Sequence, residues 1–325
     1  MTAGEGRGVA APSSLLDALR PKPFRGDVIA AGVVVLTTLV WVVATRFDDA
    51  WSDGVHLAYG LAALAFVLLL AVQAPIEGDA PRAYQSVLYV ASVALWIKVV
   101  VSLADVAGGH ATAAGTATWG LTAIAVFALA FATRRNSAVC TLIGALAAGG
   151  AVLAAVQWIW DPDGFGTDRW VLLALMVVYG FAAIGQRDRR LRHGVALIDA
   201  AGLSVLAISG SFILFPLFID FGSADHVTGV AWGWELLTVA AGFGLIAYSS
   251  VDRQPGPAYL GVLNLIFFAI ITSLGVSAAG ATLVGWPIAL ALAATALLVI
   301  GLRPTTPAPP PPDVDAPTPP PLPLR

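Results

Sequence analysis

Long apolar runs separated by short polar segments dominate the chain. An α-helix rises 1.5 Å per residue, so a run of about 18–26 residues is long enough to cross a hydrocarbon core of about 30 Å. The pattern predicts ten transmembrane helices. Their expected ranges are 28–45, 55–73, 85–107, 113–133, 138–158, 169–186, 194–219, 227–249, 258–278 and 282–302.

Two segments flank this region and differ from it. Residues 1–27 carry four basic side chains and are predicted to be a cytoplasmic lead-in to a helical bundle over 28–303. Residues 304–325 are so rich in proline that they cannot continue a helix, and they are predicted to form a disordered cytoplasmic tail. The tail is expected to act as a spacer, and the alternative is that it docks a protein partner as a polyproline segment.

Composition supports a membrane protein. The chain is 58% hydrophobic and 11% charged, whereas a soluble domain is about 25% charged. We therefore expect an all-α polytopic bundle in contact with a lipid bilayer. The net charge of −3 gives no indication of nucleic-acid binding. The single cysteine, Cys140, lies within an apolar run and cannot form an intramolecular disulfide.

Basic residues between the runs predict the orientation, because cytoplasmic loops are enriched in Lys and Arg. With the N-terminus in the cytoplasm, fourteen basic residues lie inside, two lie outside and Lys98 lies within a run. Both termini are then cytoplasmic. The excess of Arg over Lys and the abundance of Ala, Gly and Val favour the cytoplasmic membrane of a bacterium. The inside residues are Arg7, Arg20, Lys22, Arg25, Arg82, Arg134, Arg135, Arg187, Arg189, Arg190, Arg192, Arg253, Arg303 and Arg325; the outside ones are Arg46 and Arg169.

A regular spacing of the runs indicates two-helix repeats. Alternate runs begin near residues 55, 113, 169 and 227, at intervals of about 57 residues. Parallel repeats are common in transporters. Similar helix and loop lengths without duplication would give the same spacing, so both interpretations stay open.

Charged residues inside the runs are the first candidates for function. Lys98, Ser102 and Asp105 follow a helical spacing of four and three, so they form one polar stripe on the run 85–107. Glu235 lies at the same expected depth in another run. Because an isolated charge in lipid costs several kcal/mol, the sequence predicts a buried Lys98–Glu235 ion pair. The alternative is a substrate or proton site.

A second layer of polar residues is expected nearer the cytoplasm. It consists of Asp199 in the run 194–219 and Asn264 in the run 258–278. Asp199 is predicted to pair locally with Arg190, Arg192 or His193. The alternative is that it binds a cation or takes up a proton.

The chain lacks the common motifs of hydrolases, P-loop enzymes and zinc enzymes, and no cofactor is expected. Asp48 and Asp49 occupy the first outer loop. This pair resembles the acidic loop of membrane glycosyltransferases that use lipid-linked sugars. The resemblance implies acceptor activation and a bound metal at the outer face, with Asp161 and Asp163 as further acidic candidates.

The enzyme is the alternative interpretation, and we expect one of two other functions. One is a transporter of a small solute or ion, which predicts charges along a water-accessible path. The other is a non-catalytic membrane partner or scaffold, which predicts fully paired charges and interaction through the tail or the outer loops.

Overall fold

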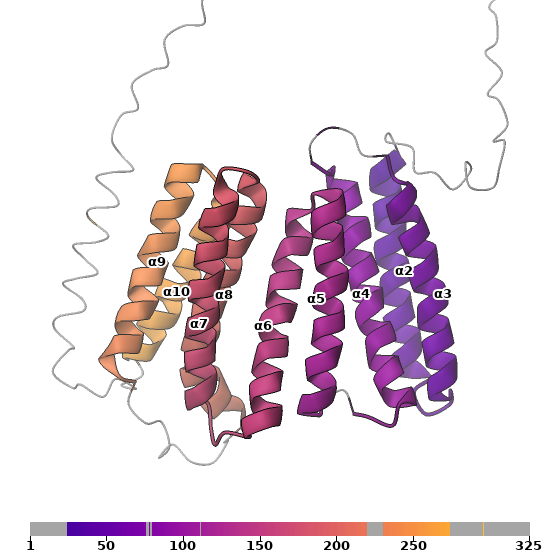
Figure 1. Ribbon diagram of the computed structural model, residues 1–325, viewed down its shortest axis with the longest axis horizontal. Helices are drawn as coiled ribbons and strands as arrows, with labels where there is room; N and C mark the ends of the chain where they lie inside the picture. The colour runs from indigo at the N-terminus through magenta and orange to yellow at the C-terminus, as the bar shows by residue number, and fades with distance from the viewer. Residues whose placement is uncertain are drawn as a thin grey trace, which may run out of the picture. The chain divides into compact units, whose positions relative to one another are not determined.

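The structure is a computed structural model that describes residues 25–75, 78, 80–110, 112–219, 230–273 and 295, with backbone alone for 213–219 and 273. Nine helices in these ranges are long and apolar enough to span a membrane (Figure 1). The protein is therefore a polytopic helical membrane protein. The helices are α2 (Gly26–Arg46), α3 (Asp53–Gln73), α4 (Ala83–Val106), α5 (Ala114–Arg135), α6 (Ala138–Trp160), α7 (Gly166–Arg187), α8 (Leu191–Ile219), α9 (Trp232–Asp252) and α10 (Pro255–Ser273).

These nine helices coincide with the first nine predicted runs to within a few residues. The tenth run, 282–302, lies outside the described residues apart from position 295, and the proline-rich tail lies wholly outside them. The chain divides into the units Met1–Ala278 and Ala279–Arg325, and all nine helices belong to the first.

Successive helices pair into hairpins. The most extensive helix contacts are those of α3 with α4, α5 with α6, α7 with α8, and α9 with α10. These pairs are the two-helix units expected from the spacing of the runs. Their internal turns, at residues 74–82, 136–137, 188–190 and 253–254, lie at one end of the helices, which is the upper end in Figure 1.

The two ends of the helices differ in charge. We call the end that carries the internal turns of the hairpins the basic end, because Arg134, Arg135 and Arg187 lie beside those turns. The opposite end carries the connections 47–52, 107–113 and 161–165, and we call it the acidic end. Asp48 and Asp161 lie in two of these connections.

Sharp turns at the basic end have local causes. Asn136 ends α5 in the left-handed conformation with φ 53°, and Arg253 ends α9 with φ 54°. Asparagine tolerates this region better than most residues because its short side chain bonds locally. Ser137 then caps α6 by accepting a hydrogen bond from the backbone N–H of Cys140.

Two helices are the most buried of the described part of the chain, α4 and α8. α4 packs against α2, α3 and α5, and α8 packs against α6, α7, α9 and α10. Lys98 lies on the first of these helices and Asp199 on the second. Lys98 and Asp199 are therefore carried by the helices with the most protein around them.

Candidate functional site

Asp199 lies in the half of α8 nearer the basic end, and its carboxylate abuts the first turn of α10. A Cβ atom added to Gly256 would lie 3.2 Å from Asp199 Oδ2. Pro255 and Pro257 flank that glycine and have no backbone N–H, so this helix start offers few donors. Oδ1 of Asp199 is buried and has no hydrogen-bond partner. The carboxylate thus retains capacity to bind a positively charged or hydrogen-bonding group.

A hollow of about 340 Å³ borders this carboxylate. Its walls come from the start of α6, the first turns of α8 and the turn between α9 and α10. Most of the lining is apolar, and the polar side chains are those of Arg192, Asp199 and Gln254. The hollow therefore places an acid and a base on the same α8 face, where they form no ion pair with each other.

The predicted local pairing of Asp199 is wrong. No ion pair joins Asp199 to Arg190, Arg192 or His193, all of which the structure describes. Arg192 shares the face of Asp199 but lies seven residues, or about 10 Å of helix rise, away. His193 lies six residues away, which places it about 120° around the helix.

His193 instead ties the start of α8 to the α5–α6 turn. Its Nε2 lies 2.8 Å from Asn136 Oδ1, and its Nδ1 lies within hydrogen-bond distance of the Thr141 hydroxyl. Because an amide oxygen only accepts, Nε2 carries the proton and Nδ1 accepts from Thr141. This buried link fixes the helix turn that precedes Asp199.

Asn264 has a positioning role in the same region. It is fully buried on α10, and its Nδ2 donates to the carbonyl of Leu260 at 3.0 Å and to that of Gly202 on α8 at 3.4 Å. The sequence placed Asp199 and Asn264 in one layer. In the structure Asn264 joins α10 to α8 one turn beyond Asp199.

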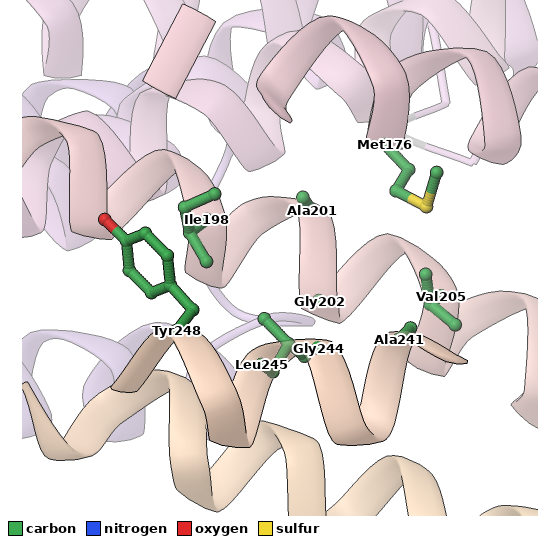
Figure 2. Close-up of a pocket in the computed structure, with 9 residues that line it drawn as sticks. All are labelled: Met176, Ile198, Ala201, Gly202, Val205, Ala241, Gly244, Leu245 and Tyr248. Carbon is green, nitrogen blue, oxygen red and sulfur yellow. The ribbon is translucent and has the colours of Figure 1, made fainter. Parts of the chain in front are cut away.

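An apolar hollow of about 260 Å³ lies on another side of α8, between α7 and α9 (Figure 2). Tyr248 lies at one end of it, and Met176 and Val205 lie toward the other. Ile198 and Leu245 line it between these ends. Apart from Tyr248, the residues that line this hollow have no polar side chain, so it has few groups that could recognise a polar ligand.

The predicted ion pair between Lys98 and Glu235 is also wrong. Both residues are buried and described, and no ion pair joins them. Their helices have different neighbours, because α9 packs mainly against α8 and α10 and α4 packs mainly in the α2–α5 region. Lys98 Nζ instead donates to Ser102 Oγ, 3.0 Å away on its own helix.

Glu235 lies in the first turn of α9 and is 1% exposed. A negative charge there is favoured by the helix dipole. One turn further along, Thr238 shares a hydrogen bond of 2.9 Å with Ser209 of α8. Glu235 therefore belongs to the α8–α9 interface near the acidic end.

The remaining acidic candidates are not gathered into one site. Asp105 is partly exposed near the end of α4, and Asp48, Asp49, Asp161 and Asp163 are exposed in the acidic-end connections. Among the described residues, no group of three or more His, Cys, Asp or Glu side chains is placed to hold a metal ion. The described residues thus do not fit the metal that the glycosyltransferase resemblance implies.

Comparison with known proteins gives no further assignment. No family model matches the sequence, and no curated protein and no solved structure matches the chain. The protein is a multi-pass membrane protein. Any finer function has to be argued from its own side chains.

The sequence reasoning missed His56. It lies in the first turn of α3, is 5% exposed, and neither of its ring nitrogens has a hydrogen-bond partner. Trp51 packs on it with ring centroids 5.5 Å apart. The available signal was the four-residue spacing of His56 and Gly60, which puts both on one helix face.

Proposed function

We propose that the protein carries a small zwitterionic solute across the membrane and binds it in the hollow beside Asp199. The observation that carries the proposal is the Asp199 carboxylate, which lines a hollow and keeps one buried oxygen without a hydrogen-bond partner. A buried polar atom in this state costs about 1–3 kcal/mol, a cost that a bound donor removes.

The chemistry of the lining points to the solute class. An ammonium group of the solute would bind Asp199 through a charge-assisted hydrogen bond, which is stronger than a neutral one. Arg192 offers a guanidinium to a carboxylate at the other end of the solute, and Gln254 offers further hydrogen bonds. Arg192 and Asp199 are about 10 Å apart along the helix, and the long arginine side chain shortens the distance between the charged groups.

The position of the hollow also favours transport over a purely structural role. The hollow lies between α6 and α8, which belong to different hairpins. Sites in transporters commonly lie between repeated helical units that move relative to one another. The scaffold interpretation gives no reason for an open carboxylate beside a hollow, and it predicts that no small solute binds there.

We further propose that the basic end faces the cytoplasm, in accord with the enrichment of Lys and Arg in cytoplasmic loops. Asp199 then binds the solute from the cytoplasmic side. The membrane would be the cytoplasmic membrane of a bacterium.

Binding can be tested on the purified full chain in detergent with a panel of small amino acids, simple amines and simple carboxylates as probes. Ligand binding raises the unfolding temperature in proportion to occupancy. We expect a zwitterion to raise it, and Asp199→Asn to abolish the rise. Asp188→Asn is the matched control, because Asp188 is an exposed aspartate at the same end.

Transport is then measured as uptake of the same radiolabelled zwitterion into proteoliposomes. Proteoliposomes with the unaltered chain or Asp188→Asn should take up the zwitterion faster than empty liposomes do. With Asp199→Asn, the uptake rate should fall at least tenfold. No binding by any zwitterion, or equal uptake by Asp199→Asn, would contradict the proposal and favour the scaffold interpretation.

A further inference from the structure

A second polar site lies between α3 and α4, in a different hairpin from Asp199. It is formed by two buried basic side chains, those of His56 and Lys98, together with Ser102. We propose that it binds a small monovalent anion, such as a halide or the carboxylate of a small acid. This goes beyond the proposed function, because neither the solute nor the Asp199 hollow is needed for it.

Gly60 shows that Lys98 packs against the face of α3 that also carries His56. A Cβ atom added to Gly60 would lie 3.8 Å from Lys98 Cγ and 3.4 Å from Val99, so this face of α3 lies directly against Lys98. His56 precedes Gly60 by four residues and therefore lies on the same face, one turn nearer the acidic end.

The direction of Lys98 brings its ammonium toward His56. α4 runs antiparallel to α3, so the turn of α4 that faces His56 is the one after Lys98, which carries Ser102. Lys98 Nζ lies 3.0 Å from Ser102 Oγ, and the lysine side chain therefore extends toward that turn. From this spacing we infer that the ammonium, the Ser102 hydroxyl and the imidazole lie at one level of the α3–α4 interface.

Both basic side chains are buried, and they have N–H donors without a partner. Lys98 is 8% exposed and His56 is 5% exposed. The ammonium of Lys98 has three N–H donors, and one of them donates a hydrogen bond to Ser102. Both nitrogens of His56 lack a hydrogen-bond partner, and either tautomer provides one N–H. The convergent donors and the positive charge of Lys98 match an anion.

The surroundings add to this preference. The site lies beside the first turn of α3, where the helix dipole favours negative charge. Trp51 covers His56 from the acidic-end connection, and its own ring packs edge-on against Tyr59 at 5.5 Å.

Asp105 is the group that could compete for Lys98. It lies on the same face of α4, is partly exposed, and is not within 4 Å of the ammonium, since no ion pair joins them. Three residues separate it from Ser102, or about 4.5 Å of helix rise. The negative charge of Asp105 repels a divalent anion more strongly than a monovalent one. The charges around the site therefore favour a monovalent anion as the ligand.

The test uses the purified full chain in detergent, and the probes are potassium chloride and potassium bromide. Potassium gluconate at the same ionic strength is the reference, because its anion is much larger than a halide. We expect chloride and bromide to raise the unfolding temperature above the gluconate value. Lys98→Met and His56→Phe should each raise the half-saturating chloride concentration at least tenfold, and Lys98→Arg should largely preserve it.

Arg169→Gln is the matched control. Arg169 is also a cation within a span, and it bonds Ser211 and lies over the ring of Phe212 on α8. Its loss should lower stability and leave the chloride effect unchanged. If Lys98→Met yields no folded protein, Ser102→Ala and His56→Gln supply the same comparison with smaller changes.

Bromide also locates the site directly, because its anomalous scattering marks its position in a crystal. A peak within hydrogen-bond distance of Lys98 Nζ would support the proposal. Equal stabilisation by chloride and gluconate, or a chloride effect that survives in every variant at the site, would overturn it. Full recovery of the stability of Lys98→Met by Asp105→Asn would also overturn it, since Lys98 would then serve as the partner of Asp105.

Discussion

Gly242 of α9 and Gly261 of α10 bring the two helix backbones into direct contact. A Cβ atom added to Gly261 would lie 2.6 Å from the carbonyl oxygen of Gly242, and one added to Gly242 would lie 3.1 Å from the carbonyl oxygen of Gly261. Small residues at helix interfaces allow this approach in membrane proteins, where van der Waals packing drives helix association.

Gly261→Ala should therefore destabilise the α9–α10 hairpin. The added methyl group meets backbone, which cannot rotate away, and overpacking of this kind costs about 1–3 kcal/mol. Thermal unfolding in detergent measures the loss. Gly244→Ala is the control, because nothing lies within 4 Å of a Cβ at that position of α9. An equal effect of the two substitutions would contradict the close contact.

His193→Leu should destabilise the protein by removing the link between α8 and the α5–α6 turn. The change leaves Asn136 and Thr141 without this partner, and a lost buried hydrogen bond costs about 1–3 kcal/mol. A double-mutant cycle with Thr141→Val should give a clear coupling energy, since the two side chains bond to each other. His110→Leu, at an exposed position, should have little effect.

Lys98→Met and Glu235→Gln should act independently. Residues without shared partners usually show additive changes in unfolding free energy to within about 0.5 kcal/mol. The double variant should therefore be as unstable as the sum of the two single changes. Stability of the double variant above that of the worse single variant would instead indicate an ion pair between them.

Single cysteines should be labelled from opposite sides of the membrane at the two ends of the helices. Asp49→Cys and Asp163→Cys, in acidic-end connections, should react with an impermeant maleimide added to whole cells. Asp188→Cys, at the basic end, should react only after the membrane is opened. The natural Cys140 is fully buried and gives a low background. Labelling of Asp163→Cys only in opened cells would invert the proposed orientation.

The sequence was sufficient to predict the described helices. Apolar runs of spanning length determine where a helix can cross lipid, and charged residues such as Arg46 and Arg135 mark where it must end. The equal spacing of the runs also anticipated the two-helix units. Whether those units arose by duplication stays a prediction.

The side-chain partners were predicted less well, and the reason is geometric. The prediction for Lys98 and Glu235 rested on equal depth, which fixes one coordinate and says nothing about which helices are neighbours. The prediction for Asp199 used closeness in sequence, although six or seven residues along a helix separate side chains by about 10 Å. The burial of His56 depends on Trp51 and α4, and no local pattern reports contacts of that range.

The short turns at the basic end determine where this bundle can change shape. Two helices closed by residues 136–137 or 188–190 cannot slide past each other by a helical turn without breaking that connection. Rearrangement is therefore confined to the boundaries between hairpins. The Asp199 hollow lies on such a boundary, between α6 and α8, so a shift of one hairpin against the other would change its size. His56 and Lys98 belong to the α3–α4 hairpin, whose connection at residues 74–82 is longer than these turns.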